Sequence, residues 1–112
     1  METKTIETQY GKRLTRGPYT SMREIERAND RAGNHWFKPD TLRFFGSRVG
    51  EDVYGGRLFV TSEKPPHGAR AWSIRAALDD GTIETVGEFL GYGSRAAAHR
   101  AARALAAELP AS

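Results

Sequence analysis

The chain has 112 residues, with 17 Lys and Arg against 14 Asp and Glu, a formal net charge of +3 and no cysteine. This length fits one domain that buries a core without a disulfide or a metal. The missing cysteine excludes thiol catalysis and every zinc motif that uses cysteine. No apolar run approaches a membrane span, and "METKTIETQYGKRLTR" does not read as a secretion signal, so we expect a cytoplasmic protein.

The positive charge lies in the N-terminal half. Residues 1–50 carry ten Lys and Arg against six Asp and Glu, whereas residues 51–112 carry seven against eight. Residues 1–19 show no clear period and include the basic residues Lys12, Arg13 and Arg16. We therefore expect a basic arm over residues 1–19, either flexible or added as an edge strand, and a single domain over residues 20–112.

The first predicted helix begins after Ser21 and ends at Gly33. Ser21 and Glu24 have the spacing of a capping box, and glycine is common just past a helix end. Apolar and small residues recur at helical spacing on one narrow face, which is formed by Met22, Ile25, Ala28 or Asn29, and Ala32.

The segment "NHWFKPDTLRFF" follows this helix. Proline disfavours helix at Lys38, and Asp40 is a candidate cap for a short helix over residues 41–45. Rings interleaved with Lys38, Arg43 and Arg48 are typical of surfaces that hold single-stranded nucleic acid. Each large ring also gains about 1.5–3 kcal/mol from burial. We therefore expect the rings to build mainly the core: Trp36, Phe37, Phe44 and Phe45.

Three strands are predicted over residues 57–62, 71–78 and 82–90. The middle strand alternates, with apolar even-numbered positions pointing inward and Arg75 pointing outward. The sequence DDG at 79–81 predicts a hairpin turn. A bulge at Gly87 would bring both Val86 and Phe89 into the core.

The last predicted helix runs from the cap Ser94 to about Leu109. Its buried stripe is formed by Ala98, Ala101, Ala102, Leu105 and Leu109. The order is therefore α-β-β-β-α, with an aromatic elbow after the first helix. We expect an α+β fold, a two-layer sandwich in which a three-stranded antiparallel sheet has both helices packed on one face.

Catalytic and metal-binding patterns are absent from the sequence. There is no G-x-S-x-G, no phosphate loop and no H-E-x-x-H. His35, His67 and His99 lie in separate segments without a short metal-ligand spacing. The glycines of "GYGS" could help a helix N-terminus hold an anion, but we expect them only to turn the chain into the helix. We therefore predict no enzymatic activity, no metal and no cofactor.

A basic surface is the best candidate for a functional site. Arg95, His99 and Arg103 are four residues apart, so they form one ridge on the last helix. Such a ridge often serves only to solvate the protein. It is also the arrangement that phosphate contacts need. The predicted nucleic-acid-binding residues are Arg75, Arg95, His99, Arg103, His67, Lys12 and Arg13.

Most of the chain, from about residue 21 to 107, resembles small uncharacterised proteins encoded by phages, prophages and plasmids of high-GC bacteria. The block N-H-W-F-x-P-D-T-x-R-F-F-x-S-R is the most specific part of this resemblance. It implies a mobile-element accessory protein. Such proteins often bind macromolecules of the host or the phage.

A local resemblance covers the second half of the chain. The segment "PPHGARAWSIRAALDDGTIETVGEFLGYGSRAAAHRAARALAAEL" is similar in element order to the second half of double-stranded-RNA-binding domains. His67 matches their loop histidine, and Ser94, Arg95 and Ala98 match the helix opening. Ala96 and His99 stand where those domains have phosphate-binding lysines, which weakens the implied contact with RNA.

These patterns together predict a non-enzymatic binding module of the phage-accessory type that contacts nucleic acid through a basic helix and sheet face. The alternative is a protein-blocking factor that binds and inhibits a host complex, such as an anti-defence or anti-CRISPR-like protein. We expect a monomer or a small homo-oligomer in either case, without contact to a membrane.

Overall fold

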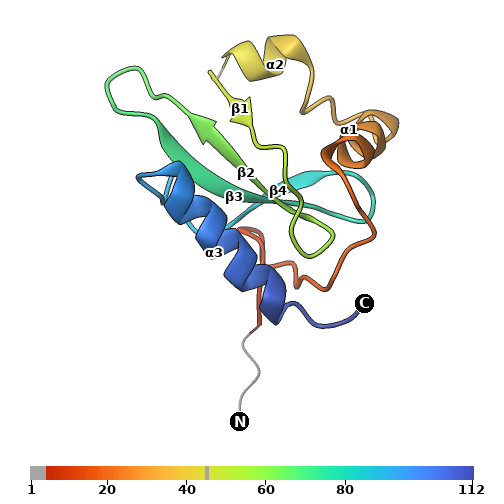
Figure 1. Ribbon diagram of the computed structural model, residues 1–112. Helices are drawn as coiled ribbons and strands as arrows, with labels where there is room; N and C mark the ends of the chain where they lie inside the picture. Colours follow the sequence, from red (N-terminus) through yellow and green to blue (C-terminus); the bar gives the residue numbers. More distant parts are fainter. Residues whose placement is uncertain (1–4, 45) are drawn as a thin grey trace.

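The computed structural model describes residues 5–44 and 46–112, which form a four-stranded antiparallel sheet with helices on both faces (Figure 1). The strands are β1 (Arg48–Val49), β2 (Leu58–Glu63), β3 (Ala71–Ala77) and β4 (Ile83–Val86), in the sheet order β1-β2-β3-β4. The helices are α1 (Met22–Arg31), α2 (Pro39–Phe44) and α3 (Arg95–Glu108). The α+β class expected from the sequence is confirmed.

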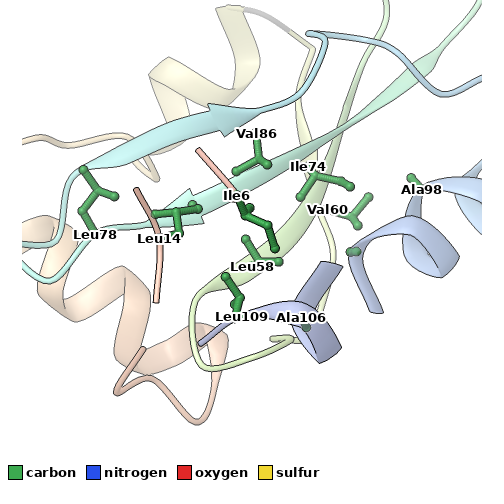
Figure 2. Close-up of a cluster of buried hydrophobic side chains, with 12 residues drawn as sticks. Ile6, Leu14, Leu58, Val60, Ile74, Leu78, Val86, Ala98, Ala106 and Leu109 are labelled. Carbon is green, nitrogen blue, oxygen red and sulfur yellow. The ribbon is translucent and has the colours of Figure 1, made fainter. Parts of the chain in front are cut away.

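The even-numbered positions of β2 and β3 face α3, because successive side chains of a strand point to opposite faces. Leu58 and Ile74 are fully buried there, against the fully buried Ala98 and Ala102 of α3. Alanine lets the backbone of α3 approach the sheet closely. Figure 2 shows this core with side chains from β2, β3, β4, α3 and the N-terminal segment converging on one another.

The odd-numbered positions of the same strands face α1. Phe59 of β2 and Ala77 of β3 are fully buried together with Ile25 of α1. The expectation that both helices pack on one face of the sheet was therefore wrong, and the molecule has three layers. The physical reason lies in β2, whose six residues are all buried and which needs cover on both sides.

The sheet has four strands where three were expected. The additional strand β1 pairs with the end of β2, with Arg48 opposite Ser62. Two residues are too few to show a strand period, so β1 could not be predicted from hydrophobic alternation. The last strand ends at Val86, because Gly87 has a φ of +76°. Phe89 is 58% exposed, so the expected bulge that brings this ring into the core was also wrong.

Serine caps begin the two longer helices, as expected. Ser21 Oγ accepts a hydrogen bond from the backbone N–H of Glu24 at 3.3 Å, and Ser94 Oγ accepts one from Ala97 at 3.2 Å. The short helix α2 begins at Pro39, one residue before the expected cap Asp40. Proline is well suited to the first helical position, where its missing N–H is not needed.

The aromatic elbow contributes only part of its rings to the core. The rings of Trp36 and Phe37 lie 6.1 and 5.9 Å from the buried ring of Phe59, measured between centroids. Phe44 is 82% exposed, so its expected role in the core was wrong. Phe45 lies outside the described residues. The elbow therefore closes the α1 face of the sheet with two rings.

A buried asparagine joins α1, the elbow and the β3–β4 turn. The Nδ2 of Asn29 donates to Asn34 Oδ1 and to the carbonyl of Gly81, both at 2.8 Å. Its Oδ1 accepts from the backbone N–H of Trp36 at 2.7 Å. Gly81 has a φ of +90°, and a Cβ there would lie 2.3 Å from the carbonyl oxygen of Ala28. The turn therefore requires glycine at this position.

Residues 5–19 include a stretch that lies beside β4 and contributes two side chains to the α3-face core. Ile6 and Leu14 are 4% and 3% exposed and pack in the cluster between the sheet and α3 (Figure 2). The backbone N–H of Gln9 donates to the carbonyl of Thr85 at 2.8 Å. Buried Arg57 holds the end of this segment, since its Nε donates to the carbonyl of Thr15 at 2.7 Å.

Candidate functional site

A cavity of about 330 Å³ lies between the β1 edge of the sheet and the first turns of α3. Four elements contribute to it: β1 and the residues just after it, the end of β2, the start of β3 and the N-terminal part of α3. We call it the arginine pocket, after its charged and aromatic lining of Arg48, Glu51, Arg70, Trp72, Arg95 and His99.

The lining of the arginine pocket is positively charged. Three arginines oppose the single carboxylate of Glu51, which leaves a net charge of +2 when His99 is neutral. Among the described residues, no carboxylate forms an ion pair with Arg48, Arg70 or Arg95. Arg48 and Arg95 are exposed. These cations are therefore available to an anionic ligand.

Arg70 is held in place by the backbone around the pocket. Its Nη1 donates to Ser62 Oγ at 2.9 Å, to the Ser62 carbonyl at 3.3 Å and to the Gly46 carbonyl at 3.1 Å. These bonds use one end of the guanidinium, which carries five N–H donors in total. The side chain is thereby fixed while its Nε and Nη2 have no hydrogen bond to a described residue.

His99 lies at the inner side of the pocket and bonds to Tyr54. The His99 Nδ1 and the Tyr54 hydroxyl are 2.8 Å apart. Burial, and next the charge of Arg95, lower the pKa of His99 from its ordinary value of 6.5, and Arg103 acts in the same direction. Asp52 acts against them. The imidazole is therefore neutral at pH 7 and would gain a proton more readily if an anion entered the pocket.

The basic ridge of α3 continues past the pocket through Arg103. The Cζ of this exposed arginine lies 5.7 Å from the centroid of the Tyr54 ring. The ring thus orients Arg103 on the same side as His99. The structure therefore brings together three of the residues that the sequence singled out, namely Arg95, His99 and Arg103.

Arg75 lies on the opposite face of the sheet, so its expected place beside the α3 ridge was wrong. Only 12% of its side chain is exposed, and its Nη2 lies 3.1 Å from Glu63 Oε1. Its Nε donates to Thr61 Oγ1 at 3.0 Å, and its Nη1 donates to Thr85 Oγ1. Because α1 and the elbow cover this face, a β3 side chain that points away from α3 is also buried.

Arg75 also forms part of a second cavity of about 280 Å³ under the elbow. Its Cζ lies 5.6 Å from the ring centroid of Trp36 and 5.1 Å from that of Phe89. Glu63 Oε2 in this region is buried without a hydrogen-bond partner among the described residues. All three guanidinium nitrogens of Arg75 have a hydrogen-bond partner, so this side chain supports the packing of the elbow and is not a surface cation.

The remaining predicted site residues lie away from the arginine pocket. His67 is exposed in the loop between β2 and β3 and is not among the lining residues. Lys12 and Arg13 are exposed beside β4, at the sheet edge opposite β1. The backbone of Arg13 forms an isolated antiparallel β-bridge with that of Glu7. Hydrogen bonds from Thr82 lower the pKa of Asp80, and the charge of Lys12 lowers it further. Lys12 therefore lies near the β3–β4 turn.

Sequence reasoning missed Arg70 and assigned Trp72 to the core alone. Arg70 is a single cation at the end of a Pro- and Gly-containing loop, so it shows neither a period nor a motif. Trp72 was correctly placed on the inward face of β3, but its ring is only half-buried and lines the pocket. The signal in the sequence that could have indicated this site is a tryptophan near the start of a strand, two residues after an arginine.

Residues 21–103 match a family of unknown function, DUF7447. The chain belongs to this family. The match to DUF7447 begins at the cap of α1 and ends at Arg103, so it includes every residue of the arginine pocket. Comparison with curated proteins and with solved structures gave no match.

Two further observations concern metal ligands and membrane spans. No group of three or more His, Asp or Glu side chains within residues 5–44 and 46–112 is placed to hold a metal ion. None of the three helices is long and apolar enough to cross a membrane.

Proposed function

We propose that this member of DUF7447 is a non-enzymatic module that binds nucleic acid through the arginine pocket and the adjoining ridge of α3. The observation that carries the proposal is the convergence of Arg48, Arg70 and Arg95 from three separate elements on one cavity. Arginine is the side chain that best matches phosphate, because its planar guanidinium makes paired hydrogen bonds.

The electrostatic surroundings support the same function. Arg95 is the first residue of α3, so the partial positive charge of the helix N-terminus adds to its own charge. Arg103 extends the cationic side along α3 beyond the neutral His99, and His67 lies in the neighbouring β2–β3 loop. A polyanion meets several donors here, which is the usual basis of nucleic-acid affinity.

The biological setting is part of the proposal. The resemblance to proteins encoded by phages, prophages and plasmids suits an accessory protein that acts in the cytoplasm, where nucleic acid is accessible. A binding module needs no catalytic group.

A protein-blocking function is the second candidate, and the elbow face favours it. Phe44 and Phe89 are 82% and 58% exposed there, beside the cavity lined by Trp36 and Leu42. Aromatic residues are enriched where proteins meet. Capture of one host protein at a fixed stoichiometry, lost in Phe89→Ser and unaffected by Arg95→Ala, would favour this function.

Fluorescence anisotropy with labelled DNA and RNA oligonucleotides at low salt tests the proposed function. The double variant Arg48→Ala/Arg95→Ala removes two exposed cations of the pocket and should weaken binding by about tenfold or more, because each phosphate contact is charge-assisted. The matched control Lys12→Ala/Arg13→Ala removes the same charge at the opposite sheet edge and should have little effect. Absence of binding, or an equal loss in both variants, would overturn the proposal.

A further inference from the structure

We propose that the arginine pocket takes one unpaired nucleotide, with its phosphate on the arginines and its base against the ring of Trp72. This inference rests on the proposed nucleic-acid binding and goes beyond it, because it names the ligand: a single-stranded segment or a chain end. A duplex, in which the bases stay paired and stacked, would be a poor ligand.

The shape of the site favours a nucleotide that enters the cavity over a nucleic-acid backbone that runs across the surface. The three arginines and His99 line a cavity of about 330 Å³, at the lower end of the volumes that small-molecule sites have. A duplex is recognised through phosphate rows and groove edges, which lie on its outer surface. A cavity with cations in its walls is better matched by one nucleotide that leaves its neighbours and enters.

Trp72 supplies the surface that a base needs. Its backbone is fixed at the start of β3, because its N–H donates to the carbonyl of Tyr92 at 2.9 Å and its carbonyl accepts from Tyr92 at 3.1 Å. The ring packs against the α3-face core but remains half-buried and lines the pocket. Stacking of bases on such rings is how proteins hold single strands without reading their sequence.

The cations around this ring are arranged for one phosphate. Arg70 is fixed by its hydrogen bonds to Ser62 and Gly46 and still offers Nε and Nη2. Arg70 precedes Trp72 by two residues, so the phosphate site and the base site lie at the same strand end. Glu51, the one carboxylate in the lining, disfavours a second phosphate in the pocket and can accept from an amino group of the base.

The two tryptophans of the chain allow a direct test by fluorescence. Trp36 lies on the α1 face and Trp72 on the α3 face of the sheet. In the variant Trp36→Phe, emission comes from Trp72 alone, and adenosine 5′-monophosphate should quench it in a saturable way. The reciprocal variant Trp72→Phe keeps Trp36 as its reporter, and its emission should not respond. Inorganic phosphate should compete with the nucleotide, and adenosine without phosphate should bind at least tenfold more weakly.

An oligonucleotide comparison completes the test on the unmodified protein. A ten-residue oligoadenylate should bind at least tenfold more tightly than the same strand annealed to its complement. Equal or tighter binding of the duplex, or oligonucleotide binding without a Trp72 response, would overturn this inference and leave the proposed function standing. A response of equal size in Trp72→Phe would place the nucleotide elsewhere and also overturn it. Failure of every oligonucleotide to bind would reject both proposals.

Discussion

Arg75 and Arg95 carry the same side chain in opposite surroundings. Arg75 is enclosed between the rings of Trp36 and Phe89 and paired with buried Glu63, whereas Arg95 is exposed at the start of α3. The sequence suggested the same role for both, because Arg75 was expected to point outward from its strand and Arg95 to lie on the basic ridge of the last helix. Only the presence of a second helical layer distinguishes them, and a single strand's alternation carries no information about what covers its outer face.

Replacement of Arg75 should therefore change stability. The variant Arg75→Met leaves the carboxylate of Glu63 buried without its cation, which costs about 3–5 kcal/mol when one partner of a buried pair is removed. Unfolding in urea measures the change. The double variant Arg75→Met/Glu63→Leu should lose less than the single one, because no buried charge remains unpaired. As a control, Arg95→Met should alter the free energy of unfolding by about 0.5 kcal/mol or less. Equal effects of the two arginine substitutions would contradict this account.

His99 differs from its two fellow histidines in its packing. It faces Tyr54, Arg95 and Arg103, with Asp52 as the one nearby carboxylate that acts on it. The spacing of four along α3 correctly grouped it with the two arginines. Its contact with Tyr54 was not predictable, because Tyr54 lies 45 positions earlier in a connection without a clear pattern.

The pH dependence of stability should report on His99. Its pKa is lowered in the folded protein, so as the pH falls below about 6.5 the unfolded chain takes up a proton first. His99 therefore reduces stability progressively between its ordinary pKa and its lower folded pKa, and has no effect above that window. In urea unfolding at pH 5.5 and 7.5, His99→Gln should lose less stability on acidification than the wild type. An unchanged pH dependence in His99→Gln would contradict the assignment.

At the scale of the element, α3 was the most predictable part of the fold. Its serine cap, its length and its alanine stripe follow from spacing alone, and the observed helix ends one residue before the expected end. The stripe works because Ala98 and Ala102 have no side-chain bulk beyond Cβ, so α3 lies close to β2 and β3. That proximity brings Arg95 and His99 over the strand end where Arg70 and Trp72 lie.

Enlarging the stripe should displace α3. Ala102→Leu introduces three carbons at a fully buried position and should destabilise the protein by about 1–3 kcal/mol, as overpacked cores do. Ala104→Leu is the matched control on the exposed side of the same helix and should be close to neutral. Thermal unfolding distinguishes them. A tolerated leucine at position 102 would mean that α3 is not packed tightly on the sheet.

Of the two short elements, α2 was expected from its cap and proline signals, whereas β1 was not. The six residues of α2 are still too few to define a face, and the two residues of β1 present no alternation. The pocket depends on β1, because Arg48 extends from it. The periodicity of the last helix therefore predicted the residues that α3 contributes to the site. The contributions of β1 and Arg70 could be identified only from the tertiary structure.

At the scale of the whole molecule, the sheet separates two surfaces, with α3 on one face and α1 on the other (Figure 1). The arginine pocket lies on the α3 side, and the cavity under the elbow lies on the α1 side. Residues 5–19 close the β4 edge with buried Ile6 and Leu14, which leaves their cations Lys12 and Arg13 on the far side from the pocket. The described cations of the N-terminal half are therefore divided between distant places, and among them only Arg48 lines the pocket.

The salt dependence of single-strand binding tests the central claim most directly. If the arginine pocket holds one phosphate and Arg103 of the ridge contacts a second, the logarithm of the affinity should fall against the logarithm of salt concentration with a slope of roughly −1.4, at about −0.7 for each phosphate. Arg95→Ala should make the slope shallower, by no more than about 0.7, because the pocket arginines share one phosphate, and Lys12→Ala should leave it unchanged. A slope near zero, or one that Arg95→Ala does not alter, would contradict nucleic-acid binding at this pocket.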